Sequence, residues 1–483
     1  MAKWTIELKD LSLGGFAPAW YKETYPSYGN KNMAGVMQNM DLSNAGFITQ
    51  GPGLANLTNG SQAAAITTLI KGATDYAVSS AAAYGVGGAK LYKFSSTTVV
   101  SDGTWPHAID KGAVTGEDGE DVTLYKGVLY YSYNHSGSAG DIGTYNLDAT
   151  FDDDWGSTVP TGAAALVGGV PHPFEVGGND VLYFGNGIYV GHYDGTTFED
   201  QGLDLPTGSV IQDIKWINDR LWILANRPDT TGTNKNSASL YVWDGTATSW
   251  ELEIPLMGTG GALHKRNGVL FVFYQDLSST GGYKLGYVGG NGITDLANFT
   301  GALPEYHQVT DYLDFLLWGS NGQIWAYGAG DKNLPVRLWQ HADGGHANLG
   351  CVITPFGTPI IASWDAGSNY RLAQFSGYDT ACNWKSVMFD ITGEMRSSHI
   401  DCVRVNFETL ASGARVDWKL LNNLGQTIYS DIVSHTKLGV VTTAYYPLKQ
   451  KVAENLRFEL DYTSGSTSNP VKIKNVRIYG HTE

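Results

Sequence analysis

The chain has 483 residues, of which 61 are glycine, 12% are aromatic and only 16% are charged, and its formal net charge is −16. This length exceeds the roughly 100–200 residues of one ordinary domain, so it predicts two domains or one large closed repeat with an appendage. The acid excess argues against nucleic acid and anionic membranes as partners, because both are bound through Lys and Arg.

Aromatic residues favour strands and glycine permits tight turns, so the composition favours an all-β protein. The three cysteines, Cys351, Cys382 and Cys402, lie far apart and form no CxxC pair. We therefore expect folding in a reducing cytoplasm. The start, MAKWTIELKD, lacks the apolar core of a secretory signal, and no apolar run approaches the ~18 residues of a membrane span. The sequence thus predicts no membrane insertion.

Residues 1–60 are rich in Gly, Pro, Asn, Tyr and Met and show neither a helical nor a strand period. Such a segment cannot bury its aromatic side chains by folding on itself. We expect an extended N-terminal arm that lies along its own chain, on the propeller predicted below, or on a neighbouring subunit. Disorder is the alternative, although disordered tails are usually poor in aromatic residues.

Residues 61–383 contain a repeat of roughly 40 to 50 residues, the size of one four-stranded propeller blade. Seven marker strands define it: KLYKF (90–94), IGTYNL (142–147), YVGHYDG (189–195), LYVWDG (240–245), KLGYVGG (284–290), QIWAYGAG (323–330) and YRLAQFSGYD (370–379). Most are preceded by a polar turn and an apolar strand such as NGVLFVFYQD (267–276). Stacked blades bury their central strands on both faces, which accounts for these apolar runs.

We therefore predict a seven-bladed β-propeller over residues 61–383. Six and eight blades stay open, because closure of a propeller often borrows a strand from the other end of the chain. A two-sheet sandwich with accidental similarity is the competing interpretation.

Residues 384–483 replace the repeat with seven strands of clean apolar and polar alternation. Val403, Val405 and Phe407 share one face of one strand, which is typical of a sheet with one buried side. This pattern predicts a C-terminal β-sandwich, jelly-roll-like in type. The segment carries 12 Lys and Arg against 10 Asp and Glu, whereas the remainder carries 19 against 37. We expect the two parts to face different partners.

Few residues suggest a metal site. Glu117, Asp118, Glu120 and Asp121 are close in sequence but lack calcium-loop spacing, so a solvated turn is the simpler interpretation. The three carboxylates of FDDDW (151–155) alternate in direction along an extended chain. The histidines of PHP (171–173) and HADGGH (341–346) stand in loops that fix no ligand geometry. We predict no metal and no cofactor.

Catalytic motifs are also lacking: the sequence holds no GxSxG, no GxxxxGK[ST] and no dinucleotide fingerprint between a strand and a helix. SWDAGSNY resembles the Asp-box of sialidase-like propellers at Ser363, Asp365, Gly367 and Tyr370. That resemblance implies a hairpin brace remote from any active site, and no counterpart of the sialidase arginine triad is recognisable. Two carboxylates that converge on a propeller axis stay open as a glycan-cleaving site. We name no catalytic residue and expect the chain not to be an enzyme.

Three strings carry a wider resemblance: WPH (105–107), FDDDWGSTVPTG (151–162) and LPTGSVIQDIKWINDRLWI (205–223). Together with the unsignalled start, the N-terminal arm and the small sandwich, they resemble β-propeller structural proteins of tailed-bacteriophage virions. The resemblance covers most of residues 40–380 and implies a part of the tail, nozzle, baseplate or surface appendage, assembled as a ring or trimer. It carries no catalytic residues.

The resemblance implies copies of the chain itself and other virion proteins as partners, and a virion location after synthesis in the host cytoplasm. The main alternative is a glycan- or receptor-binding propeller, because exposed aromatic side chains stack on sugar faces. A host-surface glycan is thus a further expected partner. A glycan-cleaving enzyme is the third hypothesis.

Overall fold

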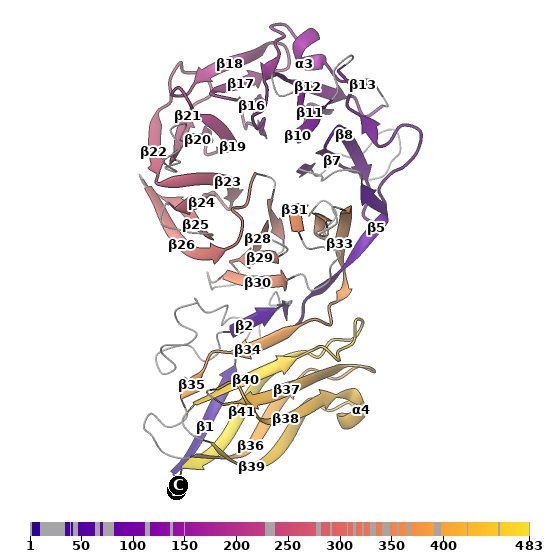
Figure 1. Cartoon of the computed structure of the whole chain (residues 1–483), viewed down its shortest axis with the longest axis vertical. Coiled ribbons are helices and arrows are strands. Elements are labelled where there is room, and N and C mark those ends of the chain that lie inside the picture. The colour runs from indigo at the N-terminus through magenta and orange to yellow at the C-terminus, as the bar shows by residue number, and fades with distance from the viewer. Residues whose placement is uncertain are drawn as a thin grey trace.

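The computed structural model describes residues 2–9, 34–38, 40–41, 47–62, 68–70, 82–111, 116–135, 139–148, 150–227, 237–276, 282–289, 292–306, 308–312, 315–320, 323–328, 335–340, 348–354, 357–364, 369–390, 398–422, 424–452 and 455–482. They form a ring of small sheets joined at its rim to a second, two-sheet unit (Figure 1). The described helices, α3 (Trp155–Thr158) and α4 (His435–Leu438), have one turn each. Neither of them is long and apolar enough to cross a membrane.

The first four blades of the ring follow the chain, each running from its innermost to its outermost strand. Their strands are β6 (Thr68–Ile70), β7 (Ala83–Gly87), β8 (Lys90–Phe94) and β9 (His107–Ala108); β10 (Asp118–Tyr125), β11 (Val128–His135), β12 (Ala139–Tyr145) and β13 (Phe151–Asp152), with β14 (Leu166–Val167) beside β12; β15 (Phe174–Val176), β16 (Leu182–Asn186), β17 (Tyr189–Tyr193) and β18 (Phe198–Asp204); and β19 (Val210–Ile217), β20 (Arg220–Arg227), β21 (Ser237–Trp243) and β22 (Leu252–Leu256).

The last three blades complete the circle. Their strands are β23 (Gly258–Arg266), β24 (Val269–Asp276), β25 (Gly282–Gly289) and β26 (Gly292–Thr300); β27 (Val309–Tyr312), β28 (Phe315–Ser320), β29 (Gln323–Tyr327) and β30 (Pro335–Gln340); and β31 (Asn348–Ile353), β32 (Ile360–Trp364), β33 (Tyr370–Tyr378) and β5 (Pro52–Gln62). The prediction of a seven-bladed propeller is confirmed.

One strand from the N-terminal side closes the ring. β5 pairs antiparallel with β33, where Arg371 lies opposite Ser61 and Phe375 opposite Leu54. It is the outermost strand of blade 7, so the domain boundary expected at residue 61 falls within β5. The borrowed strand that left the blade count open at the sequence level comes from residues 52–62.

The recurring Asp-Gly-Thr turns share one hydrogen-bond pattern. The Asp194 carboxylate accepts from the backbone N–H of Thr196 and Thr197 at 2.7 and 2.8 Å, and Gly195 has a φ of +99°. Asp244 caps its own turn in the same way, and these backbone donors lower the pKa of both carboxyls. The turns are therefore equivalent hairpins between the third and fourth strands of blades 3 and 4.

The second unit is a β-sandwich made of strands from both sides of the propeller. One sheet has the order β1 (Ala2–Lys9), β41 (Ile473–Thr482), β36 (Ser398–Phe407) and β39 (Thr443–Val452). The other has the order β2 (Ala34–Gln38), β34 (Asn383–Ser386), β40 (Asn455–Asp461), β37 (Arg415–Leu421) and β38 (Thr427–Ser434), with β35 (Phe389–Asp390) beside β40. The sandwich prediction is confirmed, and strands β38 to β41 alternate between the sheets as in a jelly roll.

The segment expected to be an extended arm supplies strands to both units. β1 pairs with β41 and β2 with β34, while β5 belongs to the propeller. Two further short strands, β3 (Met40–Asp41) and β4 (Thr49–Gln50), pair with each other. Residues 10–33 lie outside the described part. The described strands of residues 1–60 thus pair with strands of the same chain, including its C-terminal part.

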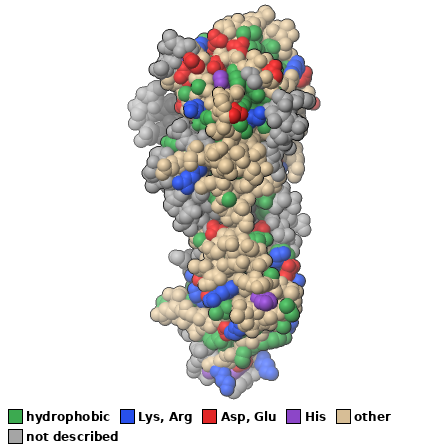
Figure 2. All heavy atoms as spheres, turned by 90° about the vertical axis from the view of Figure 1, so that its right-hand side faces the viewer, with side chains coloured by type: hydrophobic (Ala, Val, Ile, Leu, Met, Phe, Trp, Pro, Cys, Tyr) green, Lys and Arg blue, Asp and Glu red, His purple; other side chains and the backbone are tan. Residues whose placement is uncertain are grey.

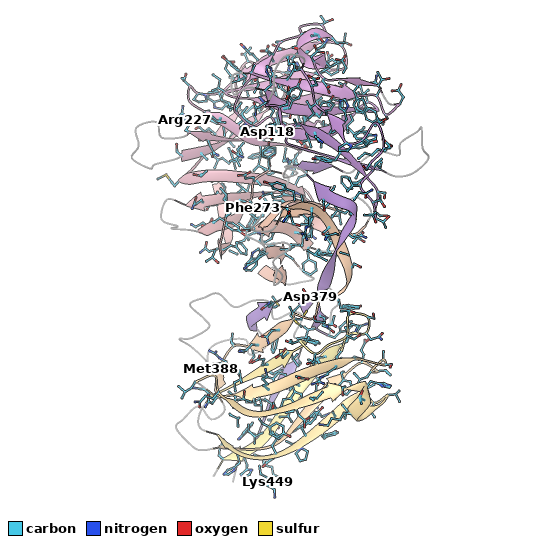
Figure 3. All side chains as sticks on the ribbon, turned by 45° about the vertical axis from the view of Figure 1, so that its right-hand side comes forward. Asp118, Arg227, Phe273, Asp379, Met388 and Lys449 are labelled. Atoms are coloured by element: carbon cyan, nitrogen blue, oxygen red, sulfur yellow. The ribbon has the colours of Figure 1, made fainter. Side chains whose placement is uncertain are left out.

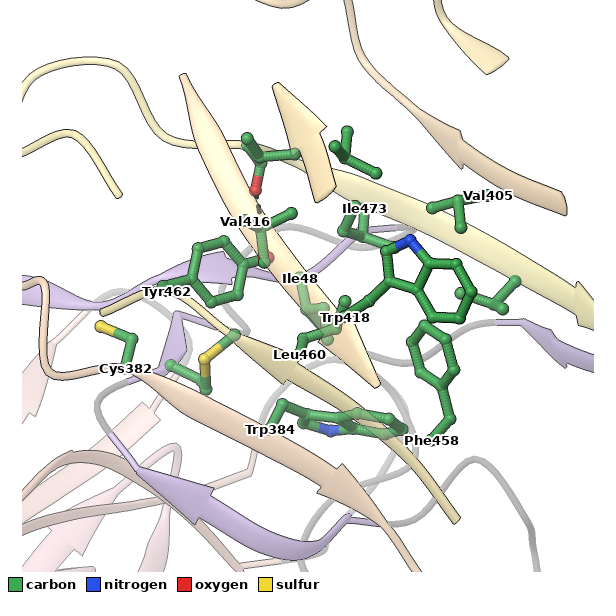
Figure 4. Close-up of a cluster of buried hydrophobic side chains, with 14 of the residues drawn as sticks. Ile48, Cys382, Trp384, Val405, Val416, Trp418, Phe458, Leu460, Tyr462 and Ile473 are labelled. Carbon is green, nitrogen blue, oxygen red and sulfur yellow. Dashed lines mark hydrogen bonds between the residues drawn. The ribbon is translucent and has the colours of Figure 1, made fainter. Parts of the chain in front are cut away.

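The sandwich core is built from large aromatic and aliphatic side chains that alternate along the strands (Figure 4). Trp418 is fully buried and its ring centroid lies 5.0 Å from that of Tyr446 and 5.7 Å from that of Phe458. Trp384, at the start of the sandwich, is equally buried. The predicted inward face of Val403, Val405 and Phe407 is buried in the same cluster.

The two units share this core at their junction. Phe315 and Leu317 of blade 6 and Phe375 of blade 7 belong to the same buried cluster as the sandwich residues. Backbone hydrogen bonds cross the junction from Tyr378 to Thr467 at 3.0 Å, and the Gln50 side chain donates to the Asp379 carbonyl at 2.9 Å. Figure 3 shows Asp379 between the units.

Replacement of Trp418 by alanine is expected to lower the free energy of unfolding of the sandwich by about 3–5 kcal/mol, because it leaves a cavity in a closely packed core. Leu424→Ala is the matched control, since that side chain is 76% exposed at a hairpin, and it should stay within about 0.5 kcal/mol of wild type. Urea unfolding followed by tryptophan fluorescence and circular dichroism measures both. Equal stability of the two variants would contradict this account of the core.

Candidate functional site

The carboxylate run of residues 117–121 begins the innermost strand of blade 2. The expectation of a solvated turn is corrected here, because Asp121 is 2% exposed and the strand β10 starts at Asp118. The Asp121 carboxylate accepts from the backbone N–H of Phe174 on β15 at 2.6 Å. It therefore ties blade 2 to blade 3.

An equivalent aspartate ties blade 4 to blade 5. Asp213 is fully buried on β19 and accepts from the backbone N–H of Leu263 on β23 at 2.7 Å. Its other oxygen accepts from Lys215 Nζ at 2.6 Å. Burial alone would lower the pKa of Lys215, but the nearby carboxylates of Asp213 and Glu175 outweigh it and raise that pKa. The lysine thus stays charged and paired.

Glu175 extends the same pattern between blades 3 and 4. Its carboxylate accepts from the backbone N–H of Trp216 at 3.0 Å and from Lys265 Nζ at 2.6 Å. The inner strands thus bring carboxylates and lysines together around the ring. Each of these carboxylates is engaged by backbone or lysine donors, which makes the group an inter-blade brace.

A tyrosine from the opposite side of the ring joins the inner strand of blade 2. Tyr306 lies between blades 5 and 6, and its hydroxyl donates to Glu120 Oε2 at 2.9 Å. Asn134 donates to the other oxygen of Glu120 at 2.6 Å. Burial is the main cause that raises the pKa of both Glu120 and Tyr306. Because blades 2 and 5 face each other in a seven-membered ring, this contact spans its centre.

The FDDDW motif lies at the junction of blades 1 and 2. Asp153 accepts from His107 Nε2 at 3.0 Å and from the backbone N–H of Asp110 at 3.1 Å, and Tyr131 donates to the same carboxylate. The two strings WPH and FDDDW, distant in sequence, are therefore in direct contact. Among the described residues no group of three or more His, Cys, Asp and Glu could hold a metal ion.

A second buried acid stands beside this junction. Asp141 is fully buried, and its carboxylate is shared by Lys111 and by the Ser157 hydroxyl, the latter at 2.6 Å. Lys111 Nζ also lies 3.0 Å from Ser157 Oγ. Because one carboxylate holds both groups, the arrangement fixes α3 and the connection after β9 to the third strand of blade 2.

The other motifs are placed as follows. His172 is fully buried, and its two ring nitrogens lie 3.0 Å from the Gly185 carbonyl oxygen and 3.3 Å from Asn134 Oδ1. The Asp-box spans the hairpin between β32 and β33, where Ser363 is buried and Asp365 and Gly367 lie outside the described residues. The histidines of HADGGH also lie outside them. Cys382 and Cys402 are free thiols.

The outer face of the four-stranded sandwich sheet differs from these internal clusters because it is basic and open. Arg404 lies directly opposite Arg477 in the pairing of β36 and β41, and Tyr445 lies opposite Arg404 on β39. Tyr445 is 61% exposed, and the Arg404 guanidinium lies 5.3 Å from its ring centroid. Arg477 is bound by Glu7 of β1 at 2.8 Å.

The next rows of this face are also basic. His399 and His481 lie opposite each other with their rings stacked at 5.2 Å, and Lys3 lies opposite His481. We call this surface the basic sheet face and define it by its residues Lys3, Lys9, His399, Arg404, Tyr445, Arg477 and His481. Sequence reasoning missed it because its residues come from four strands, one of them at the N-terminal end.

No protein-family model matches the chain, and no curated protein matches its sequence. Solved structures of similar fold include an exo-β-1,3-galactanase of Phanerochaete chrysosporium with galactose, 10% identical with a TM-score of 0.28 over 64% of this chain and 95% of that chain. They also include the extracellular domain of a protein assigned to a hybrid two-component system of B. thetaiotaomicron, 12% identical with a TM-score of 0.44 over 75% of this chain and 44% of that chain. These likenesses concern the fold alone.

The expectation that the chain is not an enzyme is corrected by these findings. The galactanase was solved with galactose and with β-1,3-galactotriose, so glycan-cleaving proteins stand among the chains of similar fold. Lack of a catalytic motif in the sequence does not exclude such chemistry, because two carboxylates that meet in space need no fixed spacing along the chain. Enzymatic activity is therefore not excluded for this chain, and the likeness by itself assigns none.

Asp213→Ala is expected to lower the free energy of unfolding of the propeller by about 3–5 kcal/mol, because it leaves the charge of Lys215 and the N–H of Leu263 without their acceptor. Asp204→Ala, at an exposed position of β18, is the control and should change it by less than about 0.5 kcal/mol. Urea unfolding of the full chain measures both. An Asp213→Ala variant as stable as the control variant would overturn the brace.

Stability should also fall with acidity through His172. Burial lowers the pKa of His172 from 6.5 to about 4. Between pH 4 and pH 6.5 this histidine is therefore protonated in the unfolded chain and neutral in the folded chain. The associated stability is present above pH 6.5 and is lost as the pH falls toward 4, by about 3 kcal/mol in total. Thermal unfolding from pH 7 to 4.5 should show this slope, and His172→Gln should flatten it. An unchanged slope in that variant would refute the assignment.

Proposed function

We propose that the protein is a structural component of a tailed-phage virion, which assembles with copies of itself and with other virion proteins through its sandwich. The proposal rests on the sequence resemblance together with the distribution of polar groups in the molecule. Three carboxylates of the inner strands, Asp121, Glu175 and Asp213, brace neighbouring blades. The propeller is thereby a rigid support.

The observation that carries the proposal is the Arg404–Arg477 pair on the exposed basic sheet face. Like charges directly opposite each other destabilise a sheet. Glu7 compensates Arg477, but no described carboxylate pairs with Arg404, so this arginine favours a role other than stability. Arginine and tyrosine are also the side chains enriched at the centres of protein interfaces. A virion subunit needs such a surface, whereas a free-standing propeller does not.

The sandwich also carries exposed apolar side chains, which supports its role as the interaction surface. Of the eight large hydrophobic side chains that are exposed among the described residues, four lie on the sandwich: Leu424, Val440, Val441 and Tyr445. Their exposed fractions range from 44% to 76%. Tyr445 lies on β39, and Val440 and Val441 precede that strand, which is an edge strand of the sheet that carries Arg404. A partner that covers these side chains would remove apolar area from water.

The test is whether the chain is part of virus particles. Particles purified on a density gradient from the sample that encodes the chain should yield its peptides by mass spectrometry, from both the propeller and the sandwich, at several copies per particle. An antiserum against the purified full chain should label one region of the particle in electron micrographs. Detection of the chain only in the particle-free fraction would overturn the proposal.

A further inference from the structure

The charges of the molecule are separated along its length. Residues 118–256, which form blades 2 to 4, carry 20 Asp and Glu against 5 Lys and Arg. These blades lie at the end of the molecule away from the sandwich (Figure 1), and Asp and Glu side chains gather over that end in the space-filling view (Figure 2). The basic sheet face lies at the other end, because β1, β36 and β39 form the far side of the sandwich.

The acidic end presents its carboxylates on an accessible edge. The outermost strands of blades 3 and 4 are β18 and β22, and each pairs with one neighbour only. Glu199 and Asp204 on β18 and Glu251 and Glu253 beside or on β22 are exposed. Two of the four have a basic partner among the described residues: Arg220 lies 2.7 Å from Glu251, and His192 Nε2 lies 3.5 Å from Glu199. We call these four residues the acidic rim.

The basic sheet face has an uncompensated charge of its own. Arg477 is paired with Glu7, but Arg404 has no carboxylate within ion-pair distance among the described residues and instead donates to Asn406 at 3.1 Å. The histidine row and Lys3 add further basic groups with Asp401 as the acid bound to His481. An anionic surface placed on this face would supply Arg404 with the carboxylate that it lacks within the described part of the chain.

We propose that the basic sheet face of one copy binds the acidic rim of blades 3 and 4 of a second copy. The inference rests on the proposed function and names the partner of its interaction surface. One chain cannot satisfy both surfaces, because they lie at opposite ends of its long axis. A contact between two different surfaces leaves each copy free to bind a further copy. The copies form a closed ring when the rotation from one copy to the next adds up to a full turn.

Tyr445 supplies the apolar part of this contact. Its ring is 61% exposed beside Arg404, so a partner can reach it. A partner that covers the ring removes apolar area from water, while Arg404 and Arg477 pair with carboxylates of the rim. This combination gives the contact orientation as well as attraction.

Charge reversal tests the contact. The face variant is Arg404→Glu with Arg477→Glu, and the rim variant is Glu199→Lys with Glu253→Lys. Sedimentation velocity of the full-length chain should show self-association that weakens as NaCl rises from about 0.05 to 0.5 M, since salt screens exposed charges. Each variant alone should weaken self-association by about tenfold or more. Mixing the two variants should restore it, because an acidic face then meets a basic rim.

Controls separate a specific contact from a general charge effect. Arg415→Glu on β37 with Lys437→Glu on α4 makes the same charge change away from the basic sheet face and should leave self-association unchanged. Circular dichroism and the thermal midpoint show that each variant folds. A wild-type chain that stays monomeric at low salt, a control that weakens association equally, or a mixture that fails to restore it would each overturn the proposal.

The test also distinguishes this inference from the proposed function. Presence of the chain in virus particles together with no effect of the face and rim variants would refute the contact and leave the virion role standing. Retention of self-association by the face variant with loss of binding to heparin, a polyanionic glycan, would assign the face to an anionic glycan. Absence from particles would refute the virion role whatever the variants show.

Discussion

Closure of the ring by β5 is the constraint on which the rest of the structure depends. Because β5 pairs with β33 in blade 7, the chain enters and leaves the propeller at the same blade. The segments on either side of the propeller are thereby brought together, although they are separated by more than 300 residues. β1 and β2 therefore meet β34 to β41 beside blade 7, where each adds an edge strand to one sheet of the sandwich.

The charged groups inside the propeller follow from the same ring geometry. Adjacent blades present their inner strands side by side, so backbone N–H groups at the blade interface need acceptors that the neighbouring blade does not supply in a ladder. Asp121 and Asp213 fill this role at corresponding positions of blades 2 and 4, each next to a bulge of its strand. Lys215 and Lys265 then neutralise carboxylates that are buried in the process. Further carboxylates lie on the outer strands of blades 3 and 4, where Glu199, Asp204 and Glu253 are exposed.

The sequence alone was enough to predict the repeat and the sandwich, because strand alternation and Asp-Gly turns are local signals. It did not reveal that residues 2–9 belong to the C-terminal unit, since the partner of β1 is decided by ring closure and by β41 at the other end of the sequence. The same reason hid the basic sheet face, where Lys3, Arg404 and Tyr445 meet across three separate parts of the chain. The carboxylates of residues 117–121 were misplaced because a polar run resembles a turn, although Asp121 is held within a strand by Phe174 of the next blade. No local sequence pattern predicts that a carboxylate accepts a hydrogen bond from a backbone N–H of the next blade.

The pairing of β1 with β41 has a consequence for biosynthesis. Ala2 lies opposite Thr482 and Lys9 opposite Asn475, so β1 cannot form this pairing until β41 has been synthesised. Any product that stops before residue 473 lacks the partner of β1 and the central strand beside β36, and with them the surface that carries Arg477. Translation through β41 is thus a precondition for the complete four-stranded sheet, and a chain that lacks β41 cannot place Arg477 opposite Arg404.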